Sequence, residues 1–201
     1  MRKAANFVVA LLFLAPAGLA HAQASPSVNH SAATPGTVNF RFSEQISNAP
    51  PGSCNCFEME GAAADVSWNL NRLGGGHGAS LALAADVGVE HTGGANGSAY
   101  GLTLTTLTGG PRLIMPGHKL RIFGQALFGF AHGSGEFPDK NALVGSANSF
   151  ALDLGGGADY ALSRRFSLRL PQLDYVRTGL PNTSTNYQNN LRIGVGLTMH
   201  F

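Results

Sequence analysis

Apolar and polar residues alternate with a period of two along most of the chain. The clearest case is residues 191–201, where every second residue from Leu191 to Phe201 is apolar and the residues between are polar or glycine. A strand presents successive residues to opposite faces, whereas a helix of this sequence would spread its apolar residues around the circumference. The pattern predicts a strand with one apolar and one polar face. Its length matches the roughly 9–11 residues of a membrane-spanning strand.

Seven further segments show the same alternation, two of them with irregularities. Within residues 99–114 the alternation slips around Gly109 and Gly110, and within 165–177 the phase changes at Pro171, where a β-bulge is expected. The segments are 38–42, 62–70, 80–90, 99–114, 119–131, 150–160 and 165–177.

The connections between these segments alternate in length. Tight connections, such as 115–118 and 163–164, follow even-numbered strands, and longer ones, such as 132–148, follow odd-numbered strands. Outer-membrane barrels have short periplasmic turns and longer extracellular loops. The sequence therefore predicts an all-β fold over residues 38–201, a closed eight-stranded antiparallel up-and-down transmembrane β-barrel. Both termini are expected in the periplasm.

The N-terminal segment has the organisation of a secretory signal peptide. Arg2 and Lys3 precede an apolar run over residues 7–20, which ends in the small-x-small motif Ala20-His21-Ala22. Residues 1–22 are the predicted signal peptide, and 23–37 a periplasmic lead to the barrel. Cleavage removes Arg2 and Lys3, so the basic residues fall from 13 to 11 and equal the 11 acidic residues.

The composition narrows the class of protein further. Charged residues make up 12% of the chain, which is about half the usual share, and glycine contributes 27 residues. A disordered chain would be charged and poor in apolar residues, and a nucleic-acid-binding domain would be strongly basic rather than +2. Both classes are excluded, so no nucleic-acid partner is expected.

Charged residues inside the predicted strands fall on the phase opposite the apolar residues. In a membrane barrel that phase faces the lumen, and an eight-stranded lumen is just wide enough to be filled by side chains. Since unpaired buried charge is costly, we expect a paired network that fills the lumen and disfavours a pore. A soluble lipocalin-like barrel remains an alternative with the same alternation. The predicted lumen charges are Arg41, Asp65, Asp86, Glu90, Arg121, Asp153, Asp159, Arg169 and Arg192.

Two sets of residues resemble a known family. The ending that contains Gly196, Met199 and Phe201 resembles the C-terminal signal by which outer-membrane proteins are recognised for assembly. Segments within 155–192, such as Gly155-Gly156-Gly157-Ala158-Asp159-Tyr160, are similar to those of the small OmpA-like and Opa-like barrels.

This resemblance implies a cell outer membrane location in a Gram-negative envelope. It implies outer membrane lipids and the outer-membrane assembly machinery as partners. The expected role is structural or in surface interaction, through an extracellular loop ligand that the sequence does not identify. No cofactor and no catalysis are expected from it.

Two groups of residues have chemistry of their own. Cys54 and Cys56 form a candidate loop disulfide, which export permits. No histidine lies at zinc-site spacing from them, so no metal is expected.

His132, Ser134 and Glu136 define an alternative function. A histidine can activate a serine hydroxyl when an acid orients the imidazole. The His-x-Ser spacing resembles that of outer-membrane lipid A deacylases and implies an outer-leaflet hydrolase, although nothing else in the chain is similar to those enzymes.

Overall fold

The computed structural model describes residues 36–48, 56–73, 78–94, 101–135, 137, 145–182 and 186–201. The predicted signal peptide lies outside these residues. Among the residues described, no helix has the length and apolar character to cross a membrane. The strands are β1 (Gly36–Ser47), β2 (Phe57–Arg72), β3 (Ser80–Thr92), β4 (Leu102–Met115), β5 (Leu120–Gly135), β6 (Ser146–Ala161), β7 (Phe166–Thr178) and β8 (Gln188–His200).

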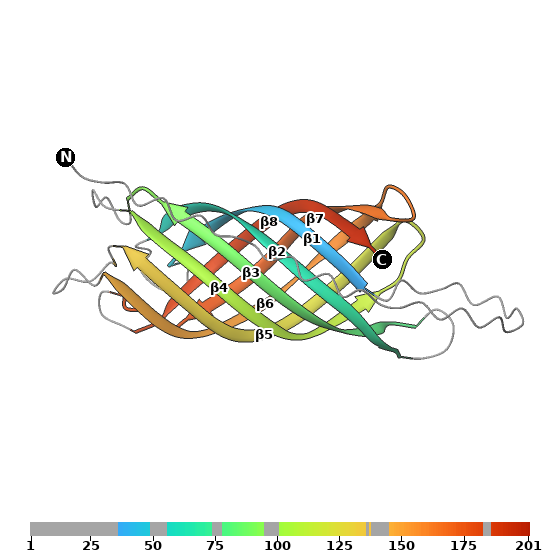
Figure 1. Ribbon diagram of the computed structural model, residues 1–201, viewed down its shortest axis with the longest axis horizontal. Helices are drawn as coiled ribbons and strands as arrows, with labels where there is room; N and C mark the ends of the chain where they lie inside the picture. The colour runs from blue at the N-terminus through green and yellow to red at the C-terminus, as the bar shows by residue number, and fades with distance from the viewer. Residues whose placement is uncertain are drawn as a thin grey trace, which may run out of the picture. The chain divides into compact units, whose positions relative to one another are not determined.

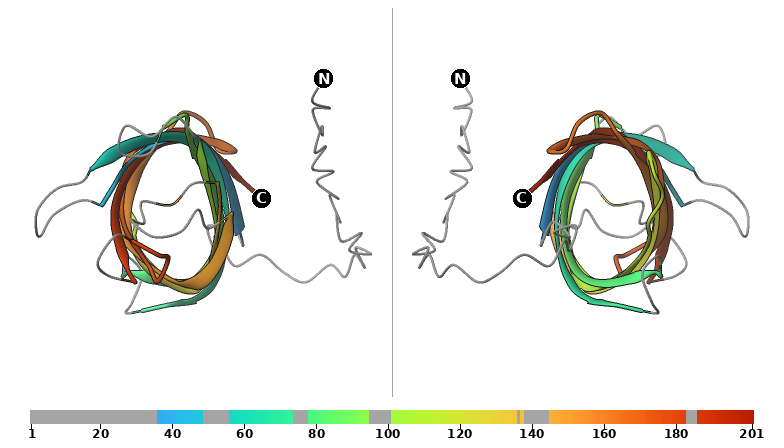
Figure 2. Two further views of the ribbon diagram at one scale, coloured as in Figure 1. Left: turned by 90° about the vertical axis from the view of Figure 1, so that its left-hand side faces the viewer. Right: turned by 90° about the vertical axis from the view of Figure 1, so that its right-hand side faces the viewer.

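The eight strands form one closed barrel. Each strand pairs antiparallel with its neighbours in the sequence, and β8 closes the sheet by pairing with β1. The strands run obliquely along the barrel (Figure 1), and the views along its length show a closed ring (Figure 2). The predicted closed eight-stranded antiparallel β-barrel is confirmed.

The two ends of the barrel differ in their connections. One end carries the connections after β2, β4 and β6, of which the last two are residues 116–119 and 162–165, together with the start of β1 and the end of β8. We call it the turn end. The opposite end, the loop end, carries the longer connections 48–56, 93–101, 136–145 and 179–187.

Several strands are longer at the loop end than their alternation indicated. The alternation recognised in the sequence begins at residue 62 in β2 and ends at 131 in β5, whereas β2 starts at Phe57 and β5 ends at Gly135. At the turn end, β1 begins at Gly36, inside the segment assigned to the periplasmic lead. The extra residues at the loop end have reversed polarity, with apolar side chains inward and polar side chains outward.

The two irregularities in the alternation have different outcomes. The expected slip at Gly109 and Gly110 is wrong, because β4 keeps one register with both β3 and β5. The expected bulge at Pro171 is confirmed by a shift in the pairing of β7 with β8 between Arg169 and Gln172.

Two glycines make room for side chains inside the barrel. A Cβ atom added at Gly88 would lie 2.6 Å from Nη1 of Arg192, and one added at Gly155 would overlap the carboxylate of Asp174. Both positions need a residue without a side chain because a large lumen residue occupies the space beside them.

Candidate functional site

Over most of the barrel, apolar side chains face outward and polar side chains face the lumen. Phe42, Leu107 and Val195 are among the exposed apolar residues, and the first of them is 79% exposed. The residues between them along the strands, such as Arg41 and Thr108, are buried. This section therefore presents an apolar outer surface and a polar interior, which is the arrangement of a barrel wall in lipid.

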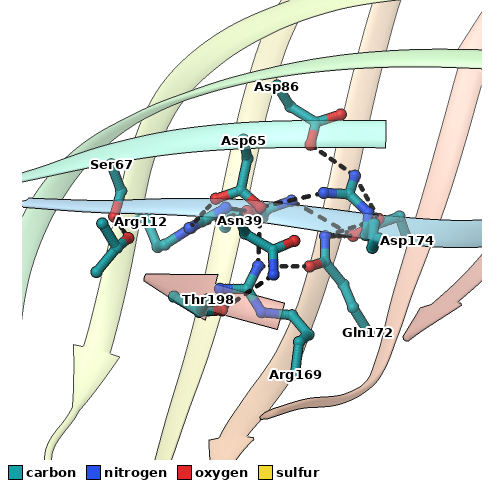
Figure 3. A network of polar contacts seen from close by, with 12 residues as sticks. Asn39, Asp65, Ser67, Asp86, Arg112, Arg169, Gln172, Asp174 and Thr198 are labelled. Atoms are coloured by element: carbon teal, nitrogen blue, oxygen red, sulfur yellow. Dashed lines mark hydrogen bonds and ion pairs between the residues drawn. The ribbon is translucent and has the colours of Figure 1, made fainter. Parts of the chain in front are cut away.

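Asp65 of β2 is one centre of the buried charges. Its carboxylate accepts hydrogen bonds from Arg41 of β1 at 3.1 Å, from Arg112 of β4 at 2.6 Å and from Arg169 of β7 at 2.8 Å. Figure 3 shows the side chains of Arg112 and Arg169 approaching this aspartate from different directions. One carboxylate therefore ties together strands that are not neighbours in the sheet.

Arg192 of β8 is the second centre. Its guanidinium forms ion pairs with Asp86 at 3.3 Å, Glu90 at 3.4 Å, Asp153 at 2.8 Å and Asp174 at 3.3 Å. The arginine is 1% exposed. It therefore forms ion pairs with acids from β3, β6 and β7 across the lumen, where an unpaired charge would be costly.

Two glutamines join the centres. Gln125 accepts a hydrogen bond from Nε of Arg112 at 3.0 Å and donates to Asp174 at 3.3 Å. Gln172 accepts from Arg169 at 3.0 Å and donates to Asp174 at 2.8 Å. We call the charged part of this assembly the lumen network. Its residues are Arg41, Asp65, Asp86, Glu90, Arg112, Asp153, Asp159, Arg169, Asp174 and Arg192.

The structure brings most of the charges singled out in the sequence into the lumen network, with one exception. Arg121 is half-buried near the turn end, where its Nη1 lies 3.4 Å from Nδ1 of His200. The residues placed in the network are Arg41, Asp65, Asp86, Glu90, Asp153, Asp159, Arg169 and Arg192.

Sequence reasoning missed two members of the network, Arg112 and Asp174. Arg112 lies beyond the glycines where the alternation of β4 was expected to slip, and Asp174 follows the bulge in β7. For Arg112 a signal was present. Strict alternation from Thr108 through Gly110 puts Arg112 on the lumen side. For Asp174, the number of residues in the bulge decides whether the side chain faces the lumen or the outside, and the sequence does not specify that number.

Apolar residues cover the lumen network toward both ends. At the turn end, the guanidinium carbons of Arg112 and Arg169 lie 4.7 and 4.5 Å from the ring centre of Phe123. At the loop end, the lumen is filled by a buried apolar cluster. Its members are Phe57, Met59, Leu102, Leu104, Ala131, Phe137, Ala151 and Leu180.

The outward face also changes at the loop end, because it becomes polar. Thr103 and Thr105 of β4 face outward beside the inward-facing Leu102 and Leu104. Among the outward-facing strand residues described at this end, Ile46 is the apolar exception. We call the polar ones the loop-end collar. They are Glu44, Glu58, Glu60, His91, Thr103, Thr105, His132, Ser134, Ser146, Asn148, Arg177 and Asn189.

The His-x-Ser pair belongs to this collar. His132 and Ser134 share the outward face of β5, and Nδ1 of His132 lies 2.6 Å from Oδ1 of Asn148 on β6. Glu136 lies outside the described residues, so its relation to His132 is not described. Among the described residues, Asn148 is the partner of the imidazole at Nδ1.

The cysteines and the C-terminal motif are placed as follows. Cys56 is disulfide-bonded, whereas Cys54 lies outside the described residues. Met199 and Phe201 are exposed on the outer surface, and the Phe201 ring lies 6.0 Å from that of Trp68. The motif thus lies at the turn end, on the strand that closes the barrel.

Comparison with solved structures identifies the architecture. The Neisserial surface protein A matches with a TM-score of 0.63 at 14% identity, covering 83% of this chain and 97% of that chain. The fold is that of the small eight-stranded outer-membrane β-barrels.

Two further barrels of this fold match. The attachment invasion locus protein Ail of Yersinia pestis matches with a TM-score of 0.54 at 12% identity, covering 83% of this chain and 97% of that one. The outer membrane enzyme PagL matches with a TM-score of 0.54 at 14% identity, covering 79% and 97%. Neither a protein-family model nor a curated protein matches the sequence.

Proposed function

We propose that this chain is an outer-membrane barrel with a structural or surface-interaction role, closed to ions, with its loop end outside the cell and its termini in the periplasm. The observation that carries the proposal is the filled lumen. Arg112, Arg169 and Arg192 are each at most 2% exposed, and apolar residues lie against the network toward both ends. An eight-stranded barrel packed in this way has no continuous path for water.

The relatives of this fold support both parts of the role. They are outer-membrane barrels, which supports the location. Ail has also been solved in complex with the heparin analogue sucrose octasulfate, which supports ligand binding by a barrel of this kind. The loops of the present chain supply the surface for such a partner.

Conductance across a planar lipid bilayer tests the closed lumen. The wild-type protein is expected to insert without steady single-channel current. The Arg192→Ala variant, which removes the cation shared by four carboxylates, is expected to show fluctuating openings. A stable open channel in the wild type would contradict the proposal. Heat-modifiable gel migration and membrane fractionation provide the control, because a soluble lipocalin-like barrel would be recovered in the periplasm without a mobility shift.

A second candidate is an outer-leaflet lipid A hydrolase that uses His132 and Ser134. The observation in its favour is the 2.6 Å contact between Nδ1 of His132 and Asn148, because it leaves Nε2 to accept a proton from a serine hydroxyl. The fold shared with the enzyme PagL is compatible with this activity.

Mass spectrometry of lipid A tests this candidate. If it is correct, cells that express the wild-type chain lose one ester-linked acyl chain, and cells that express Ser134→Ala retain it. Ser146→Ala, at a neighbouring hydroxyl on the same face, is the matched control. Identical lipid A in wild-type and Ser134→Ala cells excludes the hydrolase.

A further inference from the structure

Charge is distributed unevenly around the loop-end collar. Three glutamates, Glu44, Glu58 and Glu60, face outward on β1 and β2. On the part of the barrel that the structure describes, Arg177 of β7 is the collar's one arginine, and no lysine belongs to the collar. The collar is therefore acidic on one side and carries a single guanidinium on another.

Arg177 is held in place without an opposite charge. Its guanidinium carbon lies 4.9 Å from the ring centre of Tyr187. Within the described residues, no carboxylate lies within ion-pair distance of it, unlike the arginines of the lumen network. Stacking on an aromatic ring uses the face of the guanidinium and leaves its N–H edge able to donate hydrogen bonds.

The position of Arg177 along β7 places it at the border between the collar and the apolar outer surface. Asn189 lies opposite it on β8 and accepts a hydrogen bond from the hydroxyl of Tyr175 at 2.8 Å. On the same outward face, Leu173 of β7 and Leu191 of β8 follow toward the turn end and are exposed. Arg177 therefore lies where the polar collar meets the apolar outer surface, and in a bilayer the lipid headgroups lie at that level.

We propose that Arg177, stacked on Tyr187 and flanked by Asn189, binds the phosphate of an outer-leaflet lipid headgroup. This inference rests on the proposed function, which puts the loop end at the outer leaflet. A guanidinium edge matches a phosphate with two parallel hydrogen bonds. The glutamates of β1 and β2 repel the same group and so disfavour a phosphate on those two strands.

Lipid binding by the purified protein in neutral detergent tests the proposal, with lipid A as the phosphorylated probe and native mass spectrometry as the readout. Arg177→Gln is expected to weaken lipid A binding about tenfold or more, because it removes charge-assisted hydrogen bonds. Arg177→Lys, which keeps the charge without the planar fork, is expected to bind with intermediate affinity. Dephosphorylated lipid A is expected to bind wild type and Arg177→Gln equally weakly.

Arg165→Gln is the matched control, because it removes an exposed arginine from the turn end and is expected to leave lipid A binding unchanged. Equal binding of lipid A by wild type and Arg177→Gln overturns the proposal. Inorganic phosphate that binds the wild type as tightly as lipid A does also overturns it, because the site would then recognise a free anion.

The failure of the proposed function gives a different result. In that case the wild-type protein shows no heat-modifiable migration and does not insert into lipid vesicles. If wild type and Arg177→Gln both insert but bind lipid A equally, only the headgroup site is wrong.

Discussion

The middle of the barrel and its loop end follow the same alternation with opposite polarity. On β4, Leu102 and Leu104 face the lumen at the loop end, while Thr103 and Thr105 face outward. Farther along the same strand, the lumen side carries Thr106, Thr108 and Arg112, and Leu107 and Leu113 face outward. The strand does not slip between the two regions.

Because β4 keeps one register through both regions, strand geometry does not decide which face is apolar. In the middle section the outer surface is apolar, so polar groups are sheltered inside and must pair with one another. At the loop end the outer surface is polar and the interior is packed with apolar side chains, as in a soluble barrel. Under the proposed function, the level at which polarity reverses is the edge of the bilayer's apolar layer.

The largest expected effect comes from breaking the interior of the middle section. Arg192→Met keeps a similar volume but leaves Asp86, Glu90, Asp153 and Asp174 without their shared cation. The free energy of unfolding is expected to fall by about 3–5 kcal/mol, because buried charges lose their partner. Urea unfolding in lipid vesicles, followed by gel mobility, measures it.

Arg165→Met, at an exposed turn, is the control for that substitution and is expected to change stability by less than about 0.5 kcal/mol. Equal stability of the two variants would show that the lumen network does not hold the middle section together.

The interior of the loop end is expected to respond as a packed apolar core. Leu104→Ala removes a side chain that is 2% exposed and is expected to lower the free energy of unfolding by about 2–5 kcal/mol. Thr105→Ala, on the other face of the same strand, is the control and is expected to be nearly neutral. A neutral Leu104→Ala would mean that the apolar cluster contributes no packing energy.

The outer surfaces of the two regions can be compared by introducing an arginine at one outward position in each. Leu107→Arg introduces a charge into the apolar outer surface just inside its border with the collar and is expected to cost about 1–2 kcal/mol in lipid, between the values for the interface and for the midplane. Thr105→Arg, at the next outward position in the collar, is expected to cost about 0–1 kcal/mol. The free energy of unfolding is measured by unfolding from vesicles. If both substitutions lower it equally, the boundary between the apolar outer surface and the collar does not lie between these two positions.

The smallest expected effect is a gain within the collar. Glu44 and Glu60 lie directly opposite each other on β1 and β2, and both face outward. Glu60→Lys replaces this like-charge pair with an opposite-charge pair and is expected to add about 0.2–1 kcal/mol to the free energy of unfolding. The gain is expected to shrink in 1 M salt, where exposed charges are screened. A gain independent of salt would point to a cause other than the charge pair.

The sequence predicted the barrel well because the two-residue period is a local property. Phe40 and Phe42 on one phase and Arg41 on the other identify a two-faced strand without knowledge of its neighbours. The prediction failed at the loop end, where Glu58 and Glu60 sit outward and Phe57 and Met59 inward. There the alternation continues but the expected polarity is reversed, so the alternation was recognised only from residue 62.

The sequence by itself determined the number of strands, their antiparallel order, the bulge at Pro171 and the side of the wall on which most charges lie, because each follows from alternation and connection length. The tertiary structure decided which charges meet. Asp65 binds arginines of β1, β4 and β7 because the closed, tilted barrel brings distant strands to one level of the lumen. The tertiary structure also places Arg121 beside His200 rather than in the lumen network. It decided, too, at which level along the barrel the apolar side chains change from the outer face to the lumen. These outcomes depend on the register of eight strands closed on themselves, which no single segment encodes.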